Sequence, residues 1–129
     1  MEFRIEVEPK RVVKATVSGA VGYYDRTRIR NEIARACTAN GVRHVLVDHS
    51  ESVIKMTTAE HYSYGASFCS TNFPDRMWFG IILQEEVMAN TLALFSIAVA
   101  QNRGIRMDVF ANHQNANFAL HARLNAAHC

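Results

Sequence analysis

The stretch Val45–Glu60, VLVDHSESVIKMTTAE, determines how the rest of the chain is interpreted. Its apolar beginning predicts a buried strand over residues 42–47, and the polar residues 48–52 then predict a loop that leaves the sheet. Thr57-Thr58-Ala59-Glu60 has the spacing of a capping box. In this motif the Thr57 hydroxyl accepts a hydrogen bond from the Glu60 amide, and the Glu60 side chain reaches back to the backbone of Thr57. A strand, a loop and a helix start in this order form the region where an α/β domain places its chemistry or its partner contacts.

Patterns on both sides of this stretch predict the remaining elements. Alternating or continuous apolar residues predict strands over 3–7, 12–17, 77–83 and 105–110, with Ser18–Gly22 as a flexible exit from the second. Helical spacing predicts helices over 26–39 with Asp25 as N-cap, over 58–70, over 86–102 as the longest helix, and a last one capped by Asn112.

The predicted order is β-β-α-β-α-β-α-β-α. The short link around Pro9 makes the first two strands an antiparallel hairpin, and strands alternating with helices imply right-handed crossovers. The fold class is therefore α/β, with a mixed, mostly parallel five-stranded sheet and about four helices. With no repeat or linker in the sequence, we expect one domain over residues 1–129.

Composition excludes several classes of protein. The chain has 129 residues, of which 49% are hydrophobic and 20% charged, so it can form a sizeable core. A net charge of +2 is too small to predict a nucleic-acid binder. There is no apolar run long enough for a membrane span and no secretion signal at the N-terminus, so we expect a cytoplasmic protein.

The cysteines and histidines do not form a recognisable metal or redox motif. Three cysteines without a CxxC pair predict neither a disulfide framework nor a zinc site, and Cys37 and Cys69 are expected to be small buried hydrophobes. His49 and His61 could approach each other, but no HxH or HExxH spacing supports a metal site. No metal and no cofactor are expected.

Polar residues follow the predicted strands and should meet at one rim of the sheet. They are Gly19, Gly22, Asp48, His49, Ser50, Gln84, Glu85, Asn112 and His113, with Thr57 and Thr58 at a helix N-terminus on the same rim. Free amides and the helix dipole there would favour an anion or a phosphorylated hydroxyl.

Structural explanations compete with each functional one. Thr57 is first a helix cap, and Asp48 is first an anchor for backbone amides. The arginines of the first helix are interpreted as a solvated polar face, with a patch for an acidic partner as the alternative; they are Arg26, Arg28, Arg30 and Arg35. No phosphate-loop, dinucleotide or nucleophile-elbow motif occurs.

The element order and the central stretch resemble the STAS domain (sulphate transporter and anti-sigma-factor antagonist). Val45–Ser50 matches its apolar strand ending in "DLS", and Val53–Glu60 occupies the place of "(I/F)DSSGLG". Residues 103–120, RGIRMDVFANHQNANFAL, resemble the ending of the stage II sporulation protein AA-like family. The resemblance implies that Thr57 matches a serine phosphorylated by a partner kinase, with Thr58 next to it. Met56 and Ala59 depart from the pattern, where the family has aspartate and glycine.

Three functions remain open from the sequence. The first is a non-enzymatic STAS-like regulatory or protein-binding module, with contacts at Tyr23, Tyr24, Asp48, Thr57, Thr58 and Glu60. The second is a binding domain for a small apolar molecule or lipid, with a pocket lined by Tyr64, Phe68, Trp78, Phe79 and Phe95. The third is a small hydrolase using Asp48, His49 or His61.

Both a monomer and a homodimer stay open. In a homodimer the strand 3–7 would pair between copies, although Arg4, Glu6 and Pro9 are typical of a protected edge.

Overall fold

The structure, a computed structural model, describes residues 1–89 and 91–126. Within these residues the strands are Glu2–Glu8 (β1), Val12–Val21 (β2), His44–Ile54 (β3), Trp78–Ile82 (β4) and Arg106–Phe110 (β5). The helices are Tyr23–Asn40 (α1), Thr58–Ala66 (α2), Glu85–Met88 (α3), Thr91–Asn102 (α4) and His113–Ala126 (α5), with a 3-10 turn at Ser67–Ser70 (η1). The predicted element order and the α/β fold class are confirmed.

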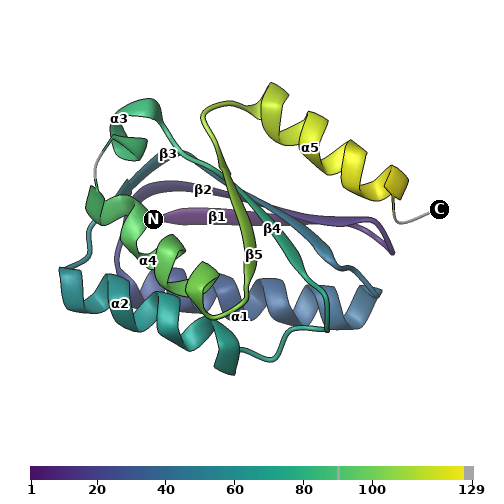
Figure 1. Ribbon diagram of the computed structural model, residues 1–129, viewed down its shortest axis with the longest axis horizontal. Coiled ribbons are helices and arrows are strands. Elements are labelled where there is room, and N and C mark those ends of the chain that lie inside the picture. Colours follow the sequence, from purple (N-terminus) through teal and green to yellow (C-terminus); the bar gives the residue numbers. More distant parts are fainter. Residues whose placement is uncertain (90, 127–129) are drawn as a thin grey trace.

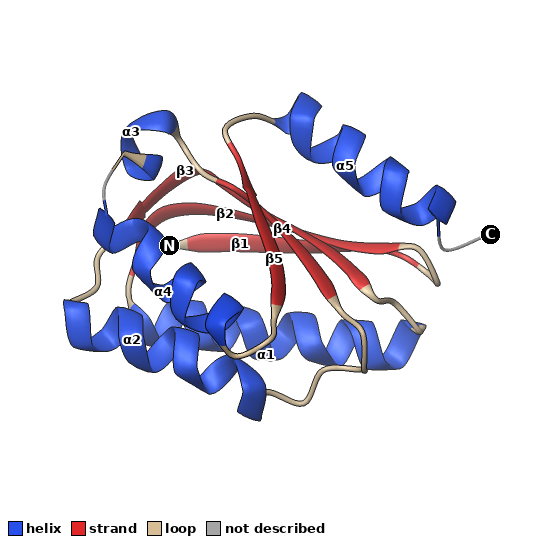
Figure 2. Cartoon of the chain, viewed as in Figure 1, coloured by secondary structure: helices blue, strands red, loops and turns tan. Residues whose placement is uncertain are grey.

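The strands lie in the order β1-β2-β3-β4-β5 (Figures 1 and 2). β1 runs antiparallel to β2, and the other neighbouring pairs are parallel. Helices cover both faces: α1, α2 and α4 lie on one, and α5 lies on the other (Figure 1). The larger core forms under α1, α2 and α4, and a smaller one joins α5 to Leu46, Trp78 and Ile82.

Three local signals predicted helix ends correctly. Gly41 has φ of 64° and its amide bonds the Cys37 carbonyl, so this left-handed position ends α1 where glycine is least strained. At α2, the Thr57 hydroxyl accepts from the Glu60 amide at 3.2 Å, and the Thr57 amide donates to Glu60 Oε1 at 2.9 Å. The capping box is therefore confirmed. Asn112 also caps α5 as predicted, since its Oδ1 accepts from the Asn115 amide at 2.8 Å.

The predicted loop at 48–52 is wrong, because β3 continues through these polar residues to Ile54. Its pairing with β2 shifts between Thr16↔Asp48 and Ser18↔Glu51, so β3 contains one extra residue, a β-bulge. The exit predicted at 18–22 is wrong for the same reason, since β2 extends to Val21 alongside this part of β3.

Three predicted helices have different bounds. The helix predicted over 58–70 ends at Ala66, and residues 67–70 form the 3-10 turn η1. α1 begins at Tyr23, so Asp25 is the third residue of the helix and not its N-cap. Asp25 Oδ2 accepts a hydrogen bond from the amide of Gly22, the actual N-cap, at 3.0 Å. The helix predicted over 86–102 consists of α3 and α4, with residue 90 outside the description, so α1 is the longest helix described.

The predicted buried faces also need correction. Helical spacing over 86–102 predicts a buried stripe made of Met88, Thr91, Leu92, Phe95, Ala98 and Val99. Val99 is buried as predicted, but Leu92 and Ala98 are exposed, and Ser96 and Ile97, which do not belong to this stripe, are buried. The Thr91 side chain lies outside the described part. Cys37 is buried as predicted, but Cys69 is exposed because it falls in η1 rather than on the inner face of a continuous helix.

Candidate functional site

The beginnings of α1 and α2 lie next to each other because the ends of β2 and β3 are paired. The Lys55 amide donates to the Val21 carbonyl at 2.8 Å, one residue before α1 is capped at Gly22. An α1 side chain then crosses to this link, since Arg26 Nη1 lies 3.6 Å from Met56 Sδ. Two helix N-termini therefore open at one end of the sheet.

Four of the predicted contact residues lie at this end. Tyr24 is 83% exposed, and its ring packs edge-to-face on the half-buried Tyr23 with centroids 5.5 Å apart. Thr57 and Thr58 are exposed at the start of α2. We call Tyr23, Tyr24, Thr57 and Thr58 the junction surface; Glu60 supports it through the capping box.

Asp48 does not join the junction surface. Its Oδ2 lies 2.8 Å from His113 Nε2, and its Oδ1 accepts from the Ser50 amide at 2.8 Å. The Gln84 side-chain amide donates to the Ser50 carbonyl. The predicted rim is thus divided: these residues meet near the start of α5, whereas the threonines lie beyond the extension of β3.

The β-bulge turns His49 and Ser52 into the core on the same face of β3. Without the extra residue, positions three apart would face opposite sides of the strand. His49 is 5% exposed and its Nδ1 lies 3.1 Å from Ser52 Oγ, which donates to the Val17 carbonyl at 2.9 Å. Burial, with a smaller effect of the Arg26 charge, lowers the pKa of His49 to about 3. His49 is therefore a neutral, buried group at pH 7.

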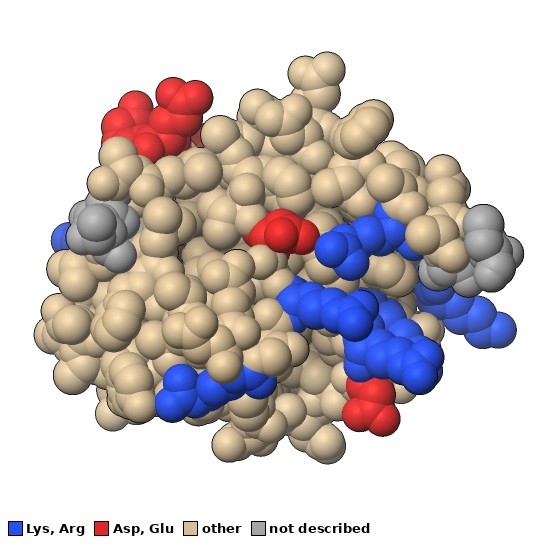
Figure 3. Space-filling view, in the orientation of Figure 1, with Lys and Arg blue, Asp and Glu red and all other residues tan. Residues whose placement is uncertain are grey.

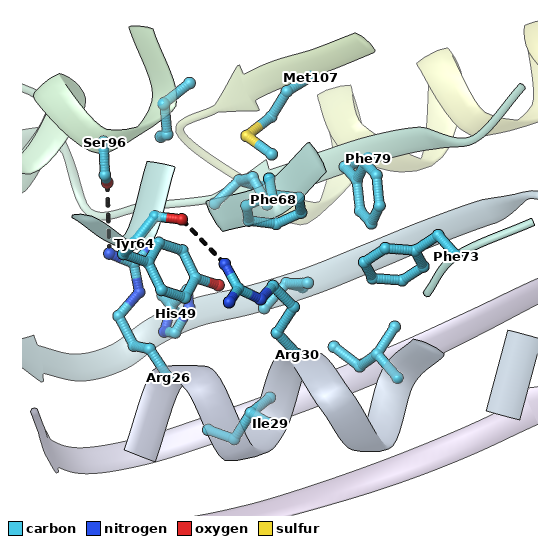
Figure 4. Close-up of a pocket in the computed structure, with 14 residues that line it drawn as sticks. Arg26, Ile29, Arg30, His49, Tyr64, Phe68, Phe73, Phe79, Ser96 and Met107 are labelled. Atoms are coloured by element: carbon cyan, nitrogen blue, oxygen red, sulfur yellow. Dashed lines mark hydrogen bonds between the residues drawn. The ribbon is translucent and has the colours of Figure 1, made fainter. Parts of the chain in front are cut away.

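The interpretation of the first helix as an arginine-rich solvated face is wrong for two of its arginines. Arg26 and Arg30 are only 6% and 5% exposed, because α2 and α4 cover this side of α1. Arg26 lies 4.0 Å and Arg30 4.6 Å from the centroid of the Tyr64 ring, so two cations flank one aromatic ring (Figure 4). The surface over α2 and α4 is largely free of charged side chains (Figure 3).

Hydrogen bonds fix both guanidinium groups. Arg26 Nη1 donates to Ser96 Oγ at 3.3 Å, and Arg30 donates to the Tyr64 carbonyl at 2.8 Å and to Ser67 Oγ at 2.9 Å. The close approach of α4 that brings Ser96 here depends on Gly65: a Cβ at this position would lie 2.3 Å from the Ser96 carbonyl oxygen.

A sequence signal for this burial existed. Arg26, Arg30, Ile33 and Cys37 follow each other at spacings of four, three and four, which is the stripe of one helix face. Residue type alone predicts that an arginine faces the solvent, whereas the position of Arg26 and Arg30 in this stripe predicts that they face the core.

A small cavity of about 30 Å³ lies beside the two arginines (Figure 4). Of the residues predicted for an apolar pocket, Tyr64, Phe68 and Phe79 line it. Trp78 instead packs on the α5 side of the sheet, and Phe95 lies against Tyr62 with centroids 6.4 Å apart. A drug-sized ligand needs about 300 Å³ or more, so this cavity has room only for a much smaller molecule or ion.

The described residues contain no group of three or more His, Cys, Asp or Glu side chains that could hold a metal ion. His61 is 3% exposed and its Nδ1 lies 3.5 Å from Ser96 Oγ, so it contributes to the same buried polar cluster as Arg26. In the part of the chain that is described, no helix is both long and apolar enough to cross a bilayer.

Comparison with solved structures identifies the fold. The chain is similar to the anti-sigma factor antagonist SpoIIAA in its unphosphorylated form, with a TM-score of 0.56 and 13% identity over 92% of this chain and 96% of that one. It is also similar to an uncharacterised protein of the DUF3478 family from Shewanella loihica, described as having a SpoIIAA-like fold, with a TM-score of 0.54 and 16% identity over 92% and 93% of the two chains. The chain therefore has the SpoIIAA, or STAS, fold. No family model matches the sequence, and the search of curated proteins gives no match.

Proposed function

We propose that the protein is a non-enzymatic STAS-type regulatory module that binds a protein partner through the junction surface. The observation that carries the proposal is the 83% exposure of Tyr24 at the start of α1, beside the exposed start of α2. An exposed aromatic ring provides a large contact area for a small loss of side-chain entropy, which is why tyrosine is common at binding hot spots.

The environment of the candidate acid-base groups supports a role other than catalysis. His49 and His61 are buried, and burial lowers the pKa of both. Asp48 is occupied by His113 and by the Ser50 amide. The cavity that His49 lines measures only about 30 Å³, which is far too small for a typical substrate.

The proposal includes a phosphorylation switch at the start of α2. The Thr57 hydroxyl is engaged by the Glu60 amide, so a phosphate on Thr57 would replace a cap that already exists. Thr58 is exposed one residue later, where the helix dipole also favours negative charge. Mass spectrometry of the protein isolated from its source cells should find phosphate on Thr58 or Thr57; unmodified threonines under all growth conditions would remove the switch from the proposal.

Partner capture tests the docking surface. Tagged wild-type protein and the double variant Tyr24→Ala/Thr58→Gln should be compared in source-cell extracts, with Phe118→Ala as the matched control. Phe118 is also a strongly exposed aromatic residue, at 78%, but it lies on α5, across the sheet from α1 and α2. We expect the double variant to lose partners that the control retains. Equal capture by all three proteins would remove the case for the junction surface.

A further inference from the structure

The cluster around Tyr64 contains two buried positive charges without a negative one. No carboxylate of the described residues lies within ion-pairing distance of Arg26 or Arg30, although each of the exposed arginines Arg4, Arg11 and Arg35 has one. Arginine is effectively always protonated in proteins, and an unpaired buried charge is strongly unfavourable. The arrangement therefore lacks a counter-charge.

The surrounding side chains do not provide that counter-charge. The carboxylates that influence the neighbouring histidines are Asp48 and Glu60, and both are engaged elsewhere, with His113 and with the Thr57 amide. Burial is the main cause that lowers the pKa of both arginines, and Tyr64, together with Tyr23 in the case of Arg30, offsets only part of that effect.

Both guanidinium groups also retain unused donors. The Nε atoms of Arg26 and Arg30 are buried and have no hydrogen-bond partner in the structure. A buried N–H without an acceptor costs about 1–3 kcal/mol, and more for a charged group. Two such donors on neighbouring turns of α1 are an independent indication that an acceptor belongs here.

The cavity that both arginines line limits the size of that acceptor. Its volume of about 30 Å³ is enough for about two water molecules. Arg26, Arg30, His49 and Ser96 line it together with apolar residues such as Ile33 and Phe79. Apolar walls provide no acceptors for the hydrogens of a water molecule, whereas a small anion needs only hydrogen-bond donors.

We propose that this cavity, which Arg26 and Arg30 both line beneath α2 and α4, is a binding site for one compact monovalent anion of halide size. The anion supplies the missing negative charge and accepts from the unpaired donors. It thereby fixes α1 against α2 and α4, the two helices that cover the arginines. The site is separate from the junction surface, and its occupancy does not depend on a protein partner.

Thermal unfolding of the full chain tests the linkage between anion and fold. Melting should be followed in sodium chloride and in sodium gluconate at equal ionic strength, because gluconate is too large for the cavity. A ligand that binds only the folded state raises Tm with the logarithm of its concentration, by about 10 °C at a hundredfold excess over its Kd. We expect this chloride-specific rise in the wild type.

Two variants separate the site from a general salt effect. Arg30→Met removes one of the two charges and should abolish the difference between chloride and gluconate. Arg35→Met is the matched control on the same helix, since Arg35 is exposed and paired with Glu32 at 2.8 Å, and it should keep the difference. Loss of the difference in both variants, or no difference in the wild type, would overturn the proposal.

A crystal of the wild-type protein grown in sodium bromide gives a result that does not depend on a variant folding. An anomalous peak is expected in the cavity lined by Arg26, Arg30, His49 and Ser96. Density for water alone in this cavity, with no anomalous signal, would overturn the proposal whatever the melting curves show.

Discussion

Replacing Gly65 by alanine tests how the cover over the buried arginines is packed. An added Cβ would lie 2.3 Å from the Ser96 carbonyl oxygen and 2.9 Å from Val99 Cβ. Carbon–oxygen contacts are normally about 3.3 Å or longer, so α4 would have to move away from α2 by about 1 Å. The same movement would weaken the bond from Arg26 to Ser96 Oγ.

The expected magnitude is a balance of opposing effects. Alanine is favoured over glycine in a helix interior by about 1 kcal/mol. Overpacking of a close contact costs about 1–3 kcal/mol, and loss of a hydrogen bond from a charged donor costs about 1.5–3 kcal/mol. The contact with backbone cannot be relieved by a side-chain rotation, so we expect Gly65→Ala to be destabilising by about 2 kcal/mol, which corresponds to a fall in Tm of about 8 °C for a domain of this size.

Urea and thermal unfolding followed by circular dichroism would measure this effect. Gly22→Ala is the matched control, because Gly22 has φ of −96° and a Cβ there would meet its nearest neighbours at an ordinary 3.8 Å. We expect the control to change the free energy of unfolding by less than about 1 kcal/mol. If Gly65→Ala were as stable as the wild type or more so, the close crossing of α2 and α4 would be refuted.

Three further predictions concern the cap, the thiols and a buried histidine. Thr57→Ala should lower the free energy of unfolding by about 1 kcal/mol in urea melts by removing the N-cap; no loss would contradict the capping box. Burial raises the pKa of Cys37 to about 12, so with the C-terminal cysteine changed to serine, a thiol reagent should label exposed Cys69 in the native protein and Cys37 only after unfolding; prompt labelling of both would contradict the burial. The pKa of His49 is about 3 in the folded protein, against an ordinary 6.5. As the pH falls, His49 therefore takes up a proton in the unfolded chain first, and the free energy of unfolding decreases from about pH 6.5 downwards. Between pH 7 and pH 5 the resulting decrease in the free energy of unfolding is about 2 kcal/mol. In urea melts, His49→Asn should show a correspondingly smaller decrease than the wild type. Equal decreases would contradict a neutral buried His49.

Sequence reasoning succeeded where a local chemical rule fixes the backbone. The capping box at Thr57 and the left-handed glycine at Gly41 each act within one helix turn, so neither depends on the remainder of the fold. The alternation of strands and helices likewise determined the order of elements and the parallel sheet.

It failed where long-range pairing decides the outcome. Residues 48–52 are polar, and only their pairing with the end of β2 keeps them in a strand. The bulge then reverses which side chains face inward, and no local pattern indicates one extra residue.

The candidate site was predicted in part. The starts of α1 and α2 lie next to each other at one end of the sheet, where the rim argument placed the threonines but not the tyrosines. Asp48 belongs to a separate set of contacts with His113. The burial of Arg26 and Arg30 depends on α2 and α4 covering α1, which residue type alone does not indicate.

The most direct test of the proposed function is the Kd of the captured partner for three proteins: wild type, Tyr24→Ala and Phe118→Ala. A hot-spot aromatic residue contributes about 2 kcal/mol or more, so Tyr24→Ala should bind about thirtyfold more weakly. Phe118→Ala should bind as tightly as the wild type. Equal affinity of Tyr24→Ala and the wild type would contradict partner binding at the junction surface.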